Sequence, residues 1–243
     1  MPEALFLKQH TPLQSIALHL LPGVLITAGY FALLGSVARV GYPSIMALVL
    51  SGMFLLVPVQ LGYLLVQGKR LNGRYGLRGV ISYRRPLPAK QYLLWVPLLF
   101  VLTGLIFTVT KPVSAILQAQ VFNAWPPLQT GMEGGFEKGA LVLTYVLFSI
   151  FIVVLGPAVE ELYFRGYLLP RMGYAGKWDV VLHSFLFAVY HFFTPWMVFT
   201  RTLGMIPLAF AVKRKNIWIS VIVHVLANSL DLFAAIAFIA SIA

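Results

Sequence analysis

The chain has 243 residues, of which 60% are hydrophobic and only 10% charged, and its mean hydropathy is +0.87. Soluble domains contain about 45–50% apolar and about 25% charged residues, so this composition excludes a water-soluble globular protein. The 18 basic residues outnumber the 7 acidic ones and give a net charge of +11. They gather in short gaps between apolar stretches, which is typical of a membrane protein and argues against nucleic-acid binding. Because the chain has no cysteine, disulfides, thiolate metal sites and cysteine nucleophiles are excluded.

A membrane-spanning helix needs roughly 20 mostly apolar residues. The apolar stretches predict an all-α polytopic bundle of about seven transmembrane helices, with six or eight as the neighbouring counts. The predicted spans are residues 15–38, 44–66, 91–110, 139–169, 180–199, 200–212 and 216–241. The sixth is too short to cross untilted, so it is either re-entrant or continuous with its neighbour through Pro195 and Trp196. No repeat or second domain is evident, and residues 1–243 are predicted to form a single integral membrane domain.

The basic residues predict an orientation, because cytoplasmic loops carry most of the Lys and Arg residues of a membrane protein. With seven spans, 14 of the 18 basic residues fall on one side, and seven of these lie between residues 69 and 90. This distribution places the N-terminus in the cytoplasm and the C-terminus outside. The basic residues assigned to the opposite side are Arg39, Lys111, Lys138 and Arg201.

Two of the seven acids are adjacent within the fourth span, at Glu160 and Glu161. A charged side chain at membrane depth costs about 2.5–3.5 kcal/mol, so such residues are functional candidates by default. Glu161 and Arg165 are i,i+4 neighbours on a helix and can pair, which leaves Glu160 free for chemistry. The structural alternative is that both carboxylates are interfacial charges at the end of this span.

The fifth and seventh spans carry further polar residues at i,i+4 spacing. Phe187 precedes His191 by four residues, and His224 precedes Asn228 by four. Taken singly, each histidine is as well explained by a hydrogen-bonded packing role as by catalysis. Counted along the helices at 1.5 Å per residue, however, the carboxylates and both histidines lie at a similar depth, roughly 12–16 Å from the cytoplasmic ends. Convergent acid, base and amide groups at one depth describe a site.

The three pairs in this order resemble the CPBP family of intramembrane proteases, also called the CAAX protease and bacteriocin-processing (Abi) family. The motifs of that family are EExxxR, FxxxH and HxxxN or HxxxD on separate transmembrane helices, and the approach to His224 from Asn216 to Ser220 is also similar. The resemblance covers about residues 140–241, which would form the catalytic core. The chain departs from the family at Pro207, where many members have a second glycine after the position of Gly204.

The resemblance implies an endopeptidase whose site opens toward the cytosol. Type II CAAX prenyl endopeptidases of this kind remove a C-terminal tripeptide from a prenylated cysteine, and bacterial relatives act in bacteriocin immunity and peptide processing. We therefore expect a multi-pass protein of a prokaryotic plasma membrane, with a membrane-bound or lipid-anchored peptide or protein as substrate. The sequence does not indicate the substrate's identity or the oligomeric state.

Peptide hydrolysis needs an activated water, a stabilised oxyanion and a protonated leaving amine. Our hypothesis makes Glu160 the general base, aided by His191. Glu161 then pairs with Arg165 to orient the helix, and His224 and Asn228 donate hydrogen bonds to the oxyanion. The metal alternative is a zinc site made of His191, His224 and Glu160 with one open position.

A different class of function uses the same polar cluster without catalysis. A non-catalytic immunity or binding protein would keep these residues to hold a partner, and a small transporter would use them to hold a solute. Transporters favour inverted repeats and matching broken helices, and the sequence shows neither. A cleavage assay is the observation that separates an enzyme from a binding protein.

Overall fold

The computed structural model describes residues 7–242, and within that range every regular element is a helix. Helices are expected from long apolar segments, because in a bilayer each backbone N–H and C=O group must find a partner within the protein. The α-helices are α1 (Pro12–Arg39), α2 (Ser44–Ser51), α3 (Val57–Asn72), α4 (Ala89–Gln120), α5 (Lys138–Phe148), α6 (Gly156–Glu160), α7 (Asp179–Val189), α8 (Val198–Arg214) and α9 (Ile217–Ser241).

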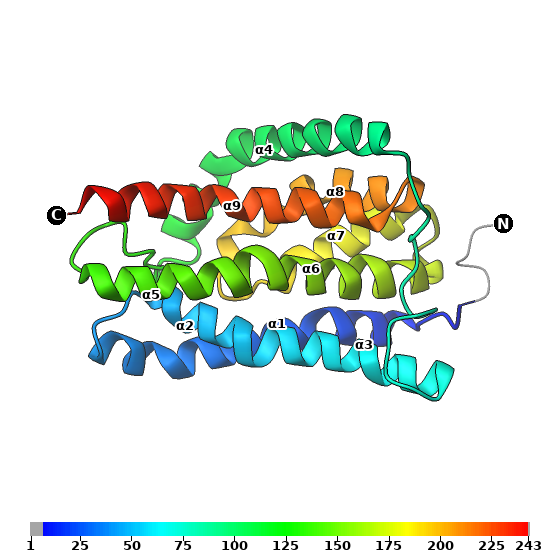
Figure 1. Ribbon diagram of the computed structural model, residues 1–243, viewed down its shortest axis with the longest axis horizontal. Coiled ribbons are helices and arrows are strands. Elements are labelled where there is room, and N and C mark those ends of the chain that lie inside the picture. The colour runs from blue at the N-terminus through cyan, green and yellow to red at the C-terminus, as the bar shows by residue number, and fades with distance from the viewer. Residues whose placement is uncertain (1–6, 243) are drawn as a thin grey trace.

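Segments of π-helix join several of these helices into longer rods. Gly52–Leu56 connects α2 to α3, Ser149–Leu155 connects α5 to α6, and Glu161–Leu168 continues α6. Two short 3₁₀ turns lie between this rod and α7, at Leu169–Arg171 and Gly173–Trp178. A third, Pro195–Met197, lies between α7 and α8. The rods run alongside one another, and α1 starts at one end of the bundle whereas α9 finishes at the other (Figure 1).

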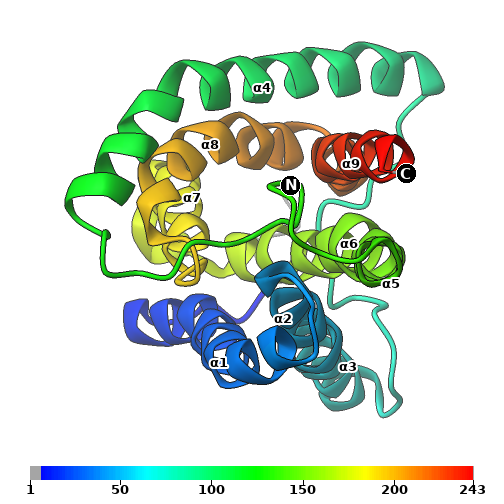
Figure 2. The same ribbon diagram turned by 90° about the vertical axis from the view of Figure 1, so that its left-hand side faces the viewer.

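The rod that contains α6 lies near the centre of the bundle. Figure 2 shows α1, α2 and α3 on one side of it, α8 and α9 on the other, and α4 along the outer side of α8 and α9. The N-terminal helix is attached through buried polar contacts: His19 Nε2 lies 3.1 Å from His183 Nδ1 of α7, and the Tyr163 hydroxyl donates to the Leu18 carbonyl at 2.8 Å. The first half of the chain therefore supports the helices that carry the motifs.

Between residues 7 and 242, six helical runs are long and apolar enough to cross a membrane: Pro12–Arg39, Ser44–Asn72, Ala89–Gln120, Lys138–Arg171, Pro195–Arg214 and Ile217–Ser241. Their outward faces carry large apolar side chains, and Leu93 and Val109 of α4 are 77% and 76% exposed. A bundle with this much apolar surface is soluble in lipid and not in water. The protein is an integral membrane protein built as a polytopic helix bundle, as the sequence predicts.

The predicted span 180–199 is wrong as a single helix. The helix α7 has 11 residues and is about 16 Å long, roughly half the thickness of a hydrocarbon core. The chain turns after Val189, where the His191 ring bonds the Phe187 carbonyl at 2.9 Å and Pro195, which lacks an N–H, starts a new turn. The predicted segment 200–212 is accordingly part of the longer α8, which continues through Pro207.

The helices α7 and α8 form a hairpin that stops part-way along the bundle (Figure 1). Its other end is closed by an ion pair between Lys213 and Asp179 at 2.5 Å. The helix α4 contains Pro97 and Pro112 and curves around α8 and α7, as Figure 2 shows. The turn between α7 and α8 therefore brings Tyr190 and His191 to an intermediate depth, where α6 carries its two carboxylates.

Candidate active site

The two glutamates lie where the α6 rod changes between α-helical and π-helical hydrogen bonding. The Gly156 N–H bonds the Phe151 carbonyl, an i→i−5 bond, and a Cβ at position 156 would lie 2.6 Å from that oxygen. Pro157 has no N–H, so it cannot form the i→i−4 hydrogen bond of a regular α-helix at the next position. Glu160 ends α6, and Glu161 begins the next π-helical segment. π-Helical segments of this kind occur frequently at functional sites.

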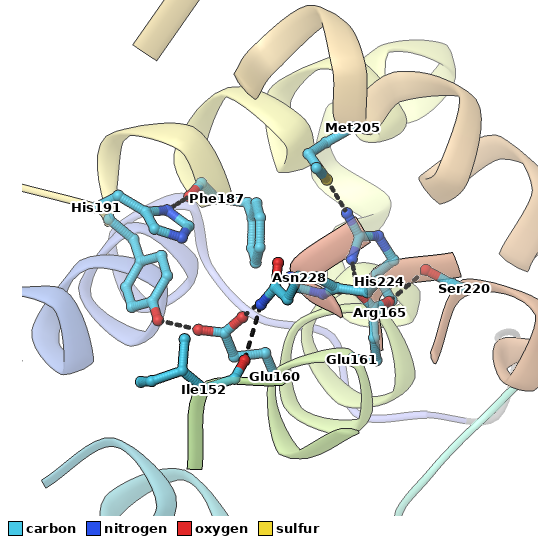
Figure 3. Close-up of polar contacts among 11 residues, drawn as sticks. Ile152, Glu160, Glu161, Arg165, Phe187, His191, Met205, Ser220, His224 and Asn228 are labelled. Carbon is cyan, nitrogen blue, oxygen red and sulfur yellow. Dashed lines mark hydrogen bonds and ion pairs between the residues drawn. The ribbon is translucent and has the colours of Figure 1, made fainter. Parts of the chain in front are cut away.

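The Glu161 carboxylate is fully buried and receives three hydrogen bonds (Figure 3). Arg165 pairs with Oε1, as the i,i+4 spacing predicts. The Ser220 hydroxyl donates to Oε2 at 2.5 Å, and His224 Nδ1 lies 2.9 Å from Oε1. Glu161 therefore joins its own helix to α9, and both of its carboxylate oxygens accept hydrogen bonds from protein groups.

Arg165 is fully buried as well and is held from two further sides. Its Nη2 donates to the Met205 sulfur at 3.2 Å, and its guanidinium carbon lies 4.9 Å from the centre of the Phe187 ring. A cation over an aromatic face is stabilised by the ring electrons, so Phe187 contributes to holding this charge. The ion pair of Arg165 with Glu161 thus connects α6, α7, α8 and α9.

The Glu160 carboxylate has a different environment, although it is also buried, with 6% of its surface exposed. The Tyr190 hydroxyl donates to Oε1. Oε2 lies 3.8 Å from His224 Nε2, a separation too long for a hydrogen bond, and no residue between 7 and 242 donates to it. Glu160 therefore keeps one oxygen available to a small polar molecule.

His224 lies between the two carboxylates. Its Nδ1 faces Glu161, which as a carboxylate only accepts, so this nitrogen carries the hydrogen. Its Nε2 is then directed toward Glu160 Oε2. The hydrogen bond to Glu161 fixes the orientation of the His224 ring, and Nε2 of that ring therefore faces the Glu160 carboxylate.

His191 lies in the turn after α7 and is half-buried. Its Nδ1 is 2.9 Å from the Phe187 carbonyl, so Nδ1 carries the hydrogen and Nε2 is the free acceptor. The ring packs against Tyr190 and Phe187, at centroid distances of 4.3 and 5.0 Å. The group that bonds Glu160 is Tyr190, the residue before His191, and not His191 itself.

Asn228 is one turn beyond His224 on α9. Its Nδ2 donates to the Ile152 carbonyl at 2.8 Å, in the π-helical segment before α6 (Figure 3). One amide hydrogen is thus used to join α9 to the α6 rod, which leaves the second hydrogen of the NH₂ group for another acceptor.

Three residues of this centre have no assigned role in the sequence analysis. Ser220 lies four residues before His224, so the i,i+4 spacing could have indicated that both face Glu161. Tyr190 is adjacent to His191, but only the end of α7 turns it toward Glu160. Nothing in the local sequence marks Met205 as a partner of Arg165.

A zinc ion held by protein side chains needs three or more ligands that converge on one point. Within the described range, no three His, Cys, Asp or Glu side chains gather in an arrangement that could hold a metal ion. His191 is turned toward the Phe187 carbonyl, and His224 directs Nδ1 to Glu161. As they are arranged, Glu160, His191 and His224 do not form a His₂Glu site.

The fold and these side chains define a class: a helical membrane protein with a buried centre of carboxylates and histidines. Residues 142–230 match the family model described as type II CAAX prenyl endopeptidase Rce1-like, and this region contains Glu160, Glu161, His191 and His224. This region is therefore similar to the CAAX-type proteases of the CPBP family, which confirms the resemblance found in the sequence. Searches of curated proteins and of solved structures found no match.

Proposed function

We propose that the protein is an intramembrane endopeptidase that hydrolyses a peptide bond of a membrane-associated or lipid-anchored peptide with a water activated by Glu160. The observation that carries the proposal is the contrast between two adjacent carboxylates. Glu161 receives three hydrogen bonds, whereas Glu160 Oε2 lies 3.8 Å from His224 Nε2 and has no donor in the part of the chain that the structure describes. Together with the family match over residues 142–230, this arrangement supports hydrolysis.

In the proposed reaction a water binds between Glu160 Oε2 and His224 Nε2. Glu160 removes one proton as the water oxygen attacks the scissile carbonyl carbon, and a tetrahedral oxyanion forms. His224 Nε2, which carries no hydrogen when Nδ1–H faces Glu161, accepts the second hydrogen of the water, and the second amide hydrogen of Asn228 donates to the oxyanion. Glu160 then gives its proton to the leaving amine, which restores the carboxylate and releases both products.

The remaining residues position these groups. The Tyr190 hydroxyl fixes the Glu160 carboxylate, and Glu161 with Arg165 and Ser220 fixes His224. His191 presents a free Nε2 beside Tyr190, where it can accept a hydrogen bond from the peptide or from the water. The metal alternative draws no support from the arrangement of Glu160, His191 and His224, so we expect hydrolysis to persist after exhaustive chelation.

We propose the orientation from the charge distribution. The loop between α3 and α4, the turn before α7 and the turn before α9 are rich in Lys and Arg, and they lie at the same end of the bundle (Figure 1). Cytoplasmic loops carry this excess, so that end would face the cytosol of a prokaryotic cell. The site would then open toward the cytosol, with the substrate held in the bilayer.

The test is a comparison of membrane peptides by mass spectrometry between cells with the wild-type protein and cells with Glu160→Gln. We expect peptide termini that are present with the wild type and missing with the variant. Glu137→Gln is the matched control, because Glu137 is exposed in the loop before α5 and its side chain makes no cap hydrogen bond. Identical termini in all three samples would contradict the proposal and favour a non-catalytic immunity or binding protein.

A further inference from the structure

Arg201, in the first turn of α8, has no acidic partner among residues 7–242. It is one of the four basic residues predicted to lie on the side opposite the cytoplasm, and the structure places it beside the turn that follows α7. Its Nη1 donates to the Thr194 hydroxyl at 2.8 Å and to the Thr194 carbonyl at 3.3 Å. No carboxylate of residues 7–242 lies within ion-pair distance of its guanidinium.

The unused side of this guanidinium is the side suited to bind an anion. Its Nε–H and Nη2–H groups make no hydrogen bond to any residue that the structure describes. These two groups lie on one edge of the planar guanidinium and point the same way, in the fork geometry that binds a carboxylate through both oxygens. Arg165, by contrast, already pairs with Glu161.

Arg201 lies next to the residues proposed for catalysis. The Thr194 N–H donates to the His191 carbonyl at 2.9 Å, so the anchor of Arg201 belongs to the same turn as His191. Tyr190, whose hydroxyl donates to Glu160, ends α7 directly before His191 and leads into this turn. A fixed positive charge is therefore held near the proposed nucleophilic water.

A charge at this depth is unfavourable unless a partner compensates it. Lipid phosphates lie in the headgroup regions, whereas the α7–α8 turn lies part-way along the bundle (Figure 1). A peptide substrate, however, carries one anion regardless of its sequence, the carboxylate at its C-terminus. That group can reach Arg201 when the bond to be cleaved lies close to the end of the chain.

We infer that Arg201 binds the C-terminal carboxylate of the substrate peptide and so selects for cleavage near the C-terminus. This inference rests on the proposed function and adds a specificity residue to it. Thr194 orients the guanidinium, and the Nε and Nη2 edge receives the carboxylate. Because the C-terminal carboxylate is held at Arg201, the peptide bond next to the water at Glu160 lies a fixed number of residues from the end of the substrate.

The experiment compares two peptide libraries that differ only at their last group. Both contain a farnesylated cysteine followed by randomised residues, and one ends in a free carboxylate whereas the other ends in a carboxamide. Full-length protein in phosphatidylcholine vesicles is incubated with each library, and products are quantified by mass spectrometry. We expect the wild type to cleave the carboxylate library about 10- to 100-fold faster, as a charge-assisted hydrogen-bonded pair requires.

Arg201→Gln should lower cleavage of the carboxylate library to the rate of the carboxamide library and leave the carboxamide rate within about threefold of the wild type. Arg201→Lys, which keeps the charge but loses the fork, should give an intermediate preference. Lys111→Gln is the matched control: Lys111 is another cation of a membrane-depth helix, in a cavity lined by Phe107, Trp196 and Thr200, and its loss should leave the preference unchanged.

Three results would overturn the inference. Equal cleavage of both libraries by the wild type would contradict the inference while leaving the proposed hydrolysis intact. An equal decrease in the cleavage rate of both libraries in Arg201→Gln would contradict it in the same way. A defect of Arg201→Gln that appears only in vesicles containing phosphatidylglycerol would assign the guanidinium to a lipid phosphate instead.

Failure of the proposed function gives a different result, because the wild type would then cleave neither library. Equilibrium binding of each library to Glu160→Gln, with and without Arg201→Gln, tests the carboxylate site without catalysis. Stronger binding of the carboxylate library that disappears in the double variant supports the inference. Equal binding of both libraries overturns it.

Discussion

Glu160 and Glu161 are neighbours in the chain, yet the two regions around them differ. The Glu161 region is closed: its carboxylate binds Arg165, Ser220 and His224 and is fully buried. The Glu160 region is incomplete, because only Tyr190 donates to that carboxylate from among the residues described, and Oε2 faces His224 Nε2 across 3.8 Å. A saturated carboxylate holds a fold together, whereas one with a free oxygen can bind and deprotonate water.

The difference arises from helix geometry. Adjacent residues point about 100° apart around a helix, so the two side chains meet different neighbours. Glu161 faces α9 and the arginine of its own rod, and Glu160 faces the end of α7. If this division is correct, substitutions on one side should affect stability and substitutions on the other should affect activity.

The largest effect is expected from Glu160→Gln, which keeps the shape of the side chain but removes the proposed base. General-base catalysis contributes about 10²- to 10⁴-fold, so cleavage should fall by at least 100-fold. Thermal unfolding in detergent, followed by circular dichroism, should change little, because this carboxylate makes one hydrogen bond. An inactive variant that also unfolds early would mean that Glu160 is a structural residue like Glu161.

Glu161→Gln should act on stability first. It leaves the Arg165 guanidinium buried without its ion pair, which costs about 3–5 kcal/mol of unfolding free energy. A double variant, Glu161→Leu with Arg165→Met, removes both charges and should recover most of that loss. The contrast between the two glutamates would be broken if Glu161→Gln unfolded no earlier than Glu160→Gln.

Tyr190→Phe should have a smaller effect on activity. It deletes the hydrogen bond that positions Glu160, so we expect kcat to fall about 10-fold, within the range for a bond to a charged group. Tyr145→Phe is the control, because the Tyr145 hydroxyl donates to the Thr130 carbonyl at 3.0 Å, away from the site. An unchanged kcat in Tyr190→Phe would show that Glu160 is positioned by other contacts.

The smallest expected effect is on the pH dependence of stability, and it comes from His10, which lies outside the site. Burial, and then the charge of Arg171, lower the pKa of His10 from its ordinary value of 6.5 to about 4. The folded protein therefore disfavours the protonated ring that the unfolded chain accepts, so stability is lost as pH falls from 6.5 toward 4. His10→Gln should flatten that decline in the unfolding midpoint, and a decline of the same size in the variant would contradict the assignment.

Local spacing predicted a substantial part of this centre. The i,i+4 rule predicted the pair of Glu161 with Arg165. The similar depth of the motifs predicted that both histidines converge with the carboxylates; His224 lies beside both of them, whereas His191 bonds the Phe187 carbonyl. The long apolar stretches predicted the helical membrane fold, because length and hydropathy determine which segments cross a bilayer.

Contacts between helices could not be predicted in the same way. The apolar run that contains His191 continues beyond Val189, so hydropathy alone gives no sign that α7 ends there. The roles of Tyr190 and Arg201 depend on that early end, since a continuous helix would have carried both elsewhere. Helix spacing describes one element at a time, and these residues act where three elements meet.

The early end of α7 also has a consequence for the membrane. The helix α7, with 11 residues, offers a shorter apolar height than α9 or α4, so the hydrophobic thickness of the protein is smaller beside α7. A bilayer adapts to a short flank by thinning, at a cost that rises with the length of the lipid chains. A thinner film beside the turn shortens the path of water and peptide to the carboxylates. The acyl chains of the host membrane thus become a variable of the reaction, and hydrolysis should slow as they lengthen.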